Sequence, residues 1–366
     1  MISMTPVLTR GYTAWDRSLF PVDEFEARVR TVQARMRDEG IAALLIFSNT
    51  YHTNGDLAFL AGWPVGGALM ALPEGQPKMF TFGGGREIFF QKNQVWLDDM
   101  SSIGPNYGPR LKAKLEEQGV VSGVVGVVGL DLLTPSGHAA LVQALGGYEL
   151  RAFDEVFHGL REAKRAREVL AVREALRIAA VASEAARAAY ESGASNAKAV
   201  VEAERAARHE GALDYRGLAN IDGDDLRPYE GLSVERQPTL TLWSAVNYHG
   251  YWADMALDTA PPGVAAQVVE AMLGVVRAGV AAGEVAQAAL NAAPKDALES
   301  ALSYGLGGGI GLELDETPRI APDSQAVLKV GSLISLRAFI KTSTGPSLAG
   351  ALVQMREDGA VRLTPA

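Results

Sequence analysis

Apolar runs and amphipathic stretches alternate through the first half of the chain. Residues 41–47, IAALLIF, form an apolar run of the length expected for a buried strand. Similar strand-like runs follow at 67–73, 77–82, 123–131 and 148–153. Segments with helical spacing lie at 24–39, 108–118 and 135–145. This alternation predicts an α/β domain over residues 1–157.

The first predicted helix has a recognisable start and end. Asp23, with Glu26 three residues later, fits a capping box, and Gly40 fits a helix stop. We therefore expect this helix to begin directly after Asp23.

The second half of the chain has a different pattern of helical and strand-like segments. A charged, alanine-rich stretch at 160–190 predicts a long helix, and further helices are expected at 195–210, 263–280 and 284–303. Strand-like segments lie at 239–246, 251–258, 330–340 and 350–358, whereas 214–236 reads as irregular polar sequence. Antiparallel strands combined with pairs of helices predict an α+β domain over residues 158–366.

A glycine-packed segment, GLGGGIGLELDETP, occupies residues 305–318. Its glycines predict a turn whose backbone approaches a ligand or a metal closely, and the apolar residues that follow predict a short strand. Yet the segment contains no histidine, cysteine, serine or lysine. The sequence therefore predicts the frame of a site without the side chains that usually act there.

Composition narrows the classes of function. Acidic residues number 43 and basic residues 34, a formal charge of -9, which argues against nucleic acid or an anionic membrane as the main partner. The chain has no cysteine, so disulfides, thiolate nucleophiles and cysteine-ligated metals are excluded. We find no apolar run of the length of a signal-peptide core or a membrane span. We expect a cytoplasmic protein that acts on a small molecule.

Three segments resemble the pita-bread family, which includes aminopeptidase P, prolidase, methionine aminopeptidase and creatinase. GGGIGLELDETP is similar to the family's GHGIGLxxHExP segment, and AVNYHGYWADMALDT resembles its metal-binding hairpin. FLAGW at 59–63 resembles a YLTGF-like stretch of the creatinase-type N-terminal domain. The resemblance covers nearly the whole chain. It implies a creatinase-type domain over 1–157, a pita-bread domain over 158–366 and, as in many relatives, a homodimer.

Metal-dependent members of this family hold two metal ions with two aspartates, one histidine and two glutamates. Carried onto this chain by the resemblance, these five positions fall on Trp243, Asp254, Gly308, Arg337 and Gly350. Only Asp254 keeps a ligand side chain, whereas zinc needs three or four protein ligands. The fixed positive charge of Arg337 would also repel a cation. We therefore expect no metal and no other cofactor.

The same resemblance places Asp315 where the family has the catalytic histidine of its HExP motif, with Glu316 beside it. These two acids and Asp254 are the candidate general acids or bases. The carboxylate of Asp254 also has a candidate structural role, as the partner of a chain cation that replaces the metal.

The substrate-binding candidates surround these acids. Arg337 could hold a substrate carboxylate with its planar fork, and Trp243 and Trp252 could form an apolar wall. Alternation along LISLRAFI puts Arg337 on one face with Ser335 and Phe339, toward the cleft. We therefore expect Arg337 and Asp254 to lie within ion-pair distance, whether the pair is catalytic or structural.

Two further places contribute candidates. The loop at 220–231, NIDGDDLRPYEG, occupies the place of creatinase's catalytic histidine but contains none, and its candidates are Asp225, Arg227 and Tyr229. His52 lies where, in the family, the N-terminal domain of a partner subunit reaches the active site. A solvated surface loop is the competing interpretation for both places.

Two classes of function follow from these residues. The first is a metal-independent enzyme that uses acid/base chemistry on a small, polar, nitrogen-containing substrate, with hydrolysis of a C–N bond as the favoured reaction. The second is a catalytically inactive pita-bread protein that binds a ligand or a partner through the vestigial cleft. A metal-dependent Xaa-Pro-type peptidase is the least supported alternative, because its ligands are missing.

Overall fold

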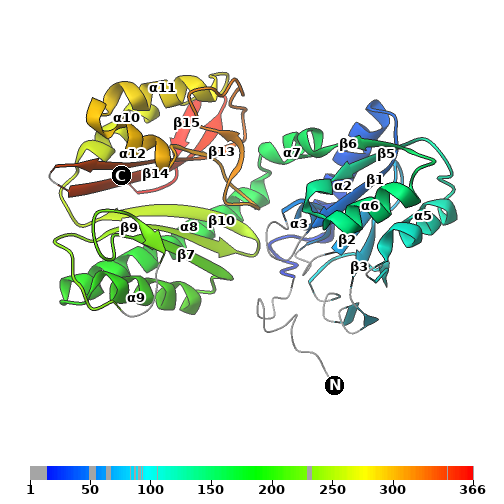
Figure 1. The fold of residues 1–366 in the computed structure, drawn as a ribbon, viewed down its shortest axis with the longest axis horizontal. Helices are drawn as coiled ribbons and strands as arrows, with labels where there is room; N and C mark the ends of the chain where they lie inside the picture. Colours follow the sequence, from blue (N-terminus) through cyan, green and yellow to red (C-terminus); the bar gives the residue numbers. More distant parts are fainter. Residues whose placement is uncertain are drawn as a thin grey trace. The chain divides into compact units, whose positions relative to one another are not determined.

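The computed structural model describes residues 15–48, 55–62, 67–82, 84–85, 88–89, 92, 94–104, 106–228, 233–343 and 345–365. The candidates His52 and Tyr229 lie outside these residues. The chain divides into two compact units, Met1–Arg161 and Glu162–Ala366, which we describe separately (Figure 1). The predicted domain boundary after residue 157 lies just before this division, within helix α7 (Asp154–Glu162).

The first unit is built on a mixed sheet with strand order β4-β3-β2-β1-β5-β6. The strands are β1 (Ile41–Ser48), β2 (Gly67–Ala71), β3 (Lys78–Thr81), β4 (Met100–Ser102), β5 (Val124–Val128) and β6 (Glu149–Ala152). The helices, besides α7, are α2 (Val22–Asp38), α3 (Gly55–Ala61), α5 (Tyr107–Glu117) and α6 (Pro135–Ala144), with a 3-10 turn at Leu130–Leu132. The predicted α/β architecture is confirmed.

The centre of this sheet is buried because helices cover both of its faces. Ala43, Leu45 and Phe47 pack with α5 and α6 in one apolar cluster. Leu44 and Ile46 point to the opposite face, are equally buried, and lie on the strand that α2 and α3 contact. Burial on both sides explains why residues 41–47 read as one continuous apolar run.

Helix α2 begins before Asp23, so the predicted capping box is wrong. Its first residue is Val22, and Pro21 stands at the cap without a side-chain hydrogen bond to the backbone. Proline suits a helix start because it has no amide hydrogen that needs a partner. Asp23 and Glu24 lie in the first turn, where negative charge stabilises the helix dipole.

The second unit is an α+β domain of two antiparallel sheets that contact each other through β10 and β14. The first sheet has the order β10-β9-β7-β8, with β7 (Asp214–Ala219), β8 (Arg227–Pro228), β9 (Thr241–Tyr248) and β10 (Tyr251–Asp258). The second has the order β12-β11-β13-β14-β15, with β11 (Gly307–Gly309), β12 (Glu316–Arg319), β13 (Leu333–Thr342), β14 (Gly345–Arg356) and β15 (Gly359–Arg362).

Helices cover the outer face of each sheet of the second unit (Figure 1). Helices α8 (Ala166–Glu191) and α9 (Asn196–His209) pack on the first sheet. Helices α10 (Val264–Leu273), α11 (Ala282–Ala292) and α12 (Leu298–Ser303), with a 3-10 turn at Lys295–Ala297, pack on the second. Among the described residues, no helix has both the length and the apolar character that crossing a membrane requires.

Three expectations for the second unit are wrong in detail. The long helix predicted at 160–190 is interrupted after Glu162, because Ala163 forms a bridge with Ser332 before α8 begins. The polar stretch that begins at residue 214 contains strand β7. In the glycine segment the glycines themselves form strand β11, whereas the apolar residues after them do not form a strand.

The glycines of β11 are required by close backbone packing. β11 lies between β13 and β12, and Gly307 has a φ of 107°, which favours glycine. A Cβ atom at Gly309 would lie 2.4 Å from the carbonyl oxygen of Thr317. The predicted close approach of this backbone is thus an approach to neighbouring strands.

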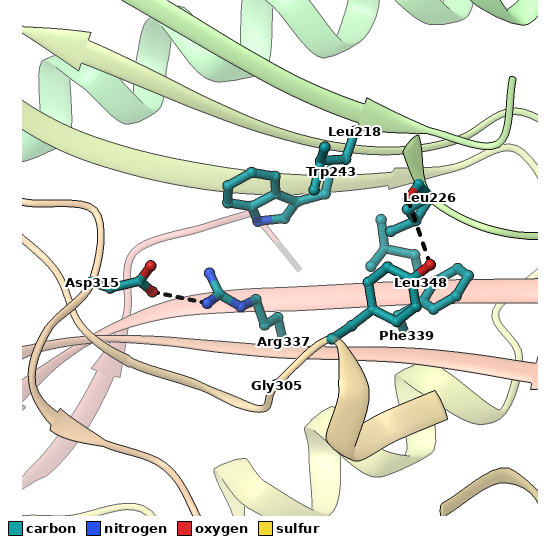
Figure 2. A pocket seen from close by; sticks show the side chains of 9 residues that line it. Leu218, Leu226, Trp243, Gly305, Asp315, Arg337, Phe339 and Leu348 are labelled. Carbon is teal, nitrogen blue, oxygen red and sulfur yellow. Dashed lines mark hydrogen bonds and ion pairs between the residues drawn. The ribbon is translucent and has the colours of Figure 1, made fainter. Parts of the chain in front are cut away.

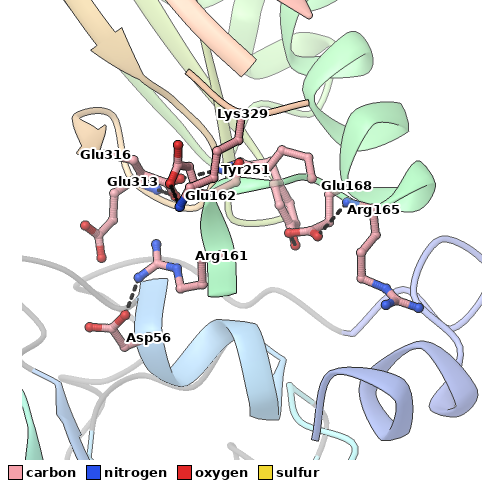
Figure 3. Close-up of polar contacts among 10 residues, drawn as sticks. Asp56, Arg161, Glu162, Arg165, Glu168, Tyr251, Glu313, Glu316 and Lys329 are labelled. Carbon is pink, nitrogen blue, oxygen red and sulfur yellow. Dashed lines mark hydrogen bonds and ion pairs between the residues drawn. The ribbon is translucent and has the colours of Figure 1, made fainter. Parts of the chain in front are cut away.

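A buried ion pair fixes the segment after β11 through Glu316, which Figure 3 labels. Lys164 Nζ lies 2.6 Å from Glu316 Oε2, and the two side chains are only 2% and 7% exposed. Gly311 packs against this pair, since a Cβ atom there would lie 2.5 Å from Lys164 Cε. A side chain at residue 311 would therefore displace Lys164 from its present position.

We predict that Gly311→Ala lowers the free energy of unfolding by about 1–3 kcal/mol, because the added methyl group displaces Lys164 from Glu316. Urea denaturation followed by far-ultraviolet circular dichroism measures the loss. Gly274→Ala is the matched control, since the nearest atom to a Cβ at Gly274 lies 3.5 Å away. Equal losses in the two variants would contradict the prediction.

Candidate functional site

A pocket with a volume of about 210 Å³ lies between the two sheets of the second unit (Figure 2). Its walls come from β7, β9, β13, β14, the loop before β8 and the segments that flank β11. The lining residues are Leu218, Leu226, Trp243, Tyr304, Gly305, Asp315, Arg337, Phe339 and Leu348. Most of this lining is apolar, and its charged groups are Arg337 and Asp315.

Asp254 lies behind the wall of this pocket, on β10, and is only 5% exposed. One of its carboxylate oxygens, Oδ2, accepts hydrogen bonds from Ser335 Oγ at 2.7 Å and from Trp243 Nε1 at 3.0 Å. The same oxygen lies 3.6 Å from Nη1 of Arg337. A buried carboxylate needs such donors to compensate for its lost hydration.

Arg337 joins this buried carboxylate to the pocket. Its Nη2 donates to Asp315 Oδ1 at 3.0 Å, and its guanidinium carbon lies 5.5 Å from the centroid of the Trp243 ring. Asp315 is 75% exposed in its side chain, whereas that of Asp254 is 6% exposed. The predicted ion pair between Arg337 and Asp254 is confirmed, and Asp315 forms a second pair with the same arginine.

The alternation predicted along β13 is confirmed. Arg337 and Phe339 line the pocket, and Ser335 reaches Asp254 on the same face. Leu336 and Ala338 lie in the apolar core that includes α10 and α11. The strand therefore separates pocket residues from core residues by its alternation alone.

The residues present do not fit a pair of metal ions. No group of three or more histidine, cysteine, aspartate or glutamate side chains suited to a metal occurs among the described residues. Arg337 and Gly350 stand opposite each other on β13 and β14, where the resemblance implied two glutamates. A Cβ atom at Gly308 would lie 3.0 Å from the carbonyl oxygen of Pro318, so a histidine there would require β12 to move.

A polar cluster of Lys341, Asp225 and Tyr304 lies beside the pocket residue Leu226. Lys341 Nζ lies 2.7 Å from Asp225 Oδ1, and the hydroxyl of Tyr304 donates to the same oxygen at 3.4 Å. The hydrogen bond with Lys341 holds the pKa of Asp225 below its usual range and raises the pKa of Lys341. These contacts tie the loop that carries Asp225 and Leu226 to Lys341 on the second sheet.

The sequence analysis did not single out Lys341 or Tyr304. Lys341 continues the alternation of Arg337 and Phe339 along β13, so that pattern could have identified it. Tyr304 directly precedes the glycine segment, and its ring packs edge-on against Phe339 with centroids 4.4 Å apart. Nothing in the local sequence distinguishes it from an ordinary surface tyrosine.

Several predicted candidates lie away from the pocket lining. Trp252 is buried, and the guanidinium carbon of Arg216 lies 4.9 Å from its ring centroid. Glu316 is held by Lys164 in the buried pair described above. Arg227 pairs with Asp222 at 3.3 Å, with both side chains exposed. Trp243, Arg337 and Asp315 are the predicted candidates that the structure brings together at the pocket.

The sequence matches two family descriptions over most of its length. Residues 171–363 match metallopeptidase family M24, and residues 28–163 match the creatinase/prolidase N-terminal domain. The chain therefore belongs to metallopeptidase family M24, with the creatinase-type and pita-bread domains that its sequence predicted. No curated protein matches the chain.

Solved structures of the same fold cover nearly the whole chain. The X-Pro aminopeptidase from Thermotoga maritima is 16% identical, with a TM-score of 0.78 over 92% of this chain and 97% of the other. The prolidase from Pyrococcus horikoshii is 19% identical, with a TM-score of 0.76 over 93% and 98%. The N-terminal domain of the FACT complex subunit SPT16 from Cicer arietinum is 14% identical, with a TM-score of 0.70 over 94% and 96%. Family and fold together show an M24 protein with the fold of the prolidases and the X-Pro aminopeptidase.

We predict that Arg337→Met lowers the free energy of unfolding by about 3–5 kcal/mol, because it leaves the buried carboxylate of Asp254 without a cation. Combining it with Asp254→Asn should recover most of the loss, since a neutral amide still accepts from Ser335 and Trp243. Chemical denaturation of the two single variants and the double variant measures this coupling. Additive losses would show that the two side chains do not depend on each other.

We also predict that the purified protein contains no stoichiometric zinc, manganese, cobalt or iron, because one carboxylate paired with arginine is a poor metal site. Elemental analysis after dialysis tests this directly. One or two metal ions per chain would contradict it, as would a melting temperature that falls when a chelator is added.

Proposed function

We propose that the protein is a metal-independent hydrolase that cleaves a C–N bond by acid/base chemistry in the pocket of its second unit. One observation carries the proposal: Arg337 lies on the pocket wall between Asp254 and Asp315. A fixed cation thus stands beside an exposed carboxylate, in the cleft where relatives with the full ligand set would hold metal. The proposal assigns substrate binding to Arg337 and proton transfer to Asp315.

The geometry gives the two aspartates different roles. Asp254 is almost fully buried, and its Oδ2 already receives Ser335, Trp243 and Arg337. We therefore assign it the positioning of Arg337 in place of the general-base role that its sequence suggested. Asp315 lines the pocket and is exposed, so it can exchange protons with water and substrate.

The reaction follows from these roles. Asp315 accepts a proton from the water that attacks the carbon of the C–N bond. It then donates that proton to the departing nitrogen, which leaves as an amine while the attacked carbon keeps the hydroxyl group. The guanidinium of Arg337 holds a carboxylate of the substrate with its planar fork, an arrangement that a lysine would not reproduce.

A catalytically inactive binding protein is the second candidate. It is favoured by the mostly apolar pocket lining and by the absence of a histidine from it. One protein of the same fold is described as part of a subunit of the FACT complex and not as a peptidase. The prolidases and the X-Pro aminopeptidase favour Xaa-Pro peptides as test substrates. A homodimer and a cytoplasmic location stay predictions.

The activity assay uses amides, Xaa-Pro dipeptides and amidino acids, each with and without chelator. We expect turnover of at least one class to survive chelation. Asp315→Asn should reduce kcat by about 10²–10⁴-fold, the usual contribution of a general acid or base. Arg337→Lys should keep the fold and lose activity, because a point charge replaces the planar fork.

Glu270→Gln is the matched control for Asp315→Asn, since Glu270 is an exposed carboxylate paired with Arg362 outside the pocket, at 3.2 Å. It should leave turnover unchanged. Activity that appears only with added metal would favour the metal-dependent peptidase instead. No turnover of any substrate class would leave the binding protein as the function.

A further inference from the structure

The size and the lining of the pocket define what it can hold. Its volume of about 210 Å³ exceeds the roughly 150 Å³ of an engineered apolar cavity that binds benzene. One aromatic ring, or one branched aliphatic group, therefore fits together with a short polar arm. A longer peptide would have to extend beyond the pocket.

The apolar part of the pocket suits a planar or branched group. Phe339, Leu348 and Leu226 form a buried apolar cluster, against which Leu218 and Trp243 pack. Tyr304 and Phe339 meet edge to face, an arrangement that aromatic rings favour with one another and with a third ring. Apart from the Tyr304 hydroxyl, which already bonds Asp225, these walls offer a polar side chain no hydrogen-bond partner.

The polar part of the pocket carries both signs of charge. Arg337 Nη2 and Asp315 Oδ1 lie 3.0 Å apart on the wall, and the side chain of Asp315 is 75% exposed. An ion pair this exposed is worth little and separates readily when a ligand offers both groups better partners. An α-amino acid supplies that match, with a carboxylate for Arg337 and an ammonium group for Asp315.

We infer that the pocket binds an α-amino acid with an aromatic or branched aliphatic side chain, and that this amino acid is the leaving group of the reaction. The inference rests on the proposed function for its catalytic half only. The substrate is then an N-acyl derivative of that amino acid, either an N-acyl amino acid or a dipeptide.

The proton balance agrees with the placement of the two charges. Water adds its hydroxyl to the acyl carbon, the C–N bond breaks, and Asp315 passes the proton of water to the departing nitrogen. The amine leaves with the proton that Asp315 passes to it, and the new carboxylic acid then loses its own proton to that nitrogen. The products are therefore a carboxylate and an amino acid, whose ammonium group faces Asp315. Arg337 holds the carboxylate of the amino acid throughout.

Isothermal titration calorimetry with four small probes tests the binding half without turnover. L-Phenylalanine carries the ring and both charges. 3-Phenylpropanoate lacks the ammonium group, phenethylamine lacks the carboxylate, and L-alanine lacks the ring. Each of the three should bind about tenfold more weakly than phenylalanine, or worse, because each leaves one part of the pocket unmatched.

Variants assign the binding to this pocket. Arg337→Gln should remove the advantage of phenylalanine over phenethylamine, and Asp315→Asn its advantage over phenylpropanoate. Leu218→Trp, which adds bulk to a half-buried wall residue without altering a charged side chain, should abolish binding while circular dichroism stays unchanged. Arg216→Gln is the control, because Arg216 also lies over a tryptophan but does not line the pocket.

Binding of the amino acid and cleavage of its N-acyl derivative are tested by separate outcomes. If phenylalanine does not bind, or binds no better than phenylpropanoate, phenethylamine or alanine, the ligand class is wrong. Binding that survives Leu218→Trp would also overturn the site. If phenylalanine binds as expected but N-acetylphenylalanine and Xaa-Phe dipeptides are not cleaved, the ligand class stands and the hydrolase proposal fails. Cleavage of other amides without preference for an apolar leaving group would overturn the inference and leave the hydrolase in place.

Discussion

A buried negative charge must be compensated, and in this protein the compensation of Asp254 organises the second unit. Its carboxylate draws hydrogen-bond donors from β9 and β13 to one point beside β10. An isolated carboxylate at this depth would cost several kcal/mol. The contacts that Asp254 makes with β9 and β13 therefore stabilise the register of these strands. The contact between the two sheets is polar at this point, whereas the cluster beneath the outer helices α10 and α11 is apolar.

The orientation of the pocket's cation follows from that compensation. Arg337 is tied to the buried carboxylate on one side and lies over the Trp243 ring on the other, so its guanidinium has few rotamers open to it. A side chain held in this way binds a partner with a smaller loss of conformational entropy than a free surface arginine. The buried aspartate thereby contributes to recognition without touching a ligand.

The sequence could predict those parts of the fold that local pattern controls. The apolar run at 41–47 and the alternation around Arg337 follow directly from burial on two faces and on one face of a strand. Strand β7 was missed because DYRGLA mixes buried Tyr215 and Ala219 with an exposed arginine and a glycine. Its pairing with β9, which the local sequence does not encode, decides its conformation.

The site could be predicted only where it follows the same local rule. The alternation along β13 predicted that Arg337 faces the cleft near Asp254. The resemblance identified Asp315 as a candidate. Glu316 looked equally suitable, but a lysine 152 residues away in the chain binds it. The interruption before α8 has the same long-range origin, since residues 163–165 contain neither proline nor glycine. Periodicity describes neighbouring residues in the chain, so it cannot predict contacts between distant segments.

The crowding around Gly308 bears on how this chain could be redesigned. In a roomier structure, one substitution to histidine could begin to build a metal site at this position. Here the carbonyl oxygen of Pro318 on β12 lies 3.0 Å from where a side chain at residue 308 would start, and Arg337 and Trp243 stand at two other positions that the resemblance aligns with ligands. A histidine at residue 308 would require β12 to shift by a few tenths of an ångström, and it would still meet an arginine where a further ligand is needed. Engineering a metal centre into this cleft therefore takes several concerted substitutions, because no single one improves metal binding by itself.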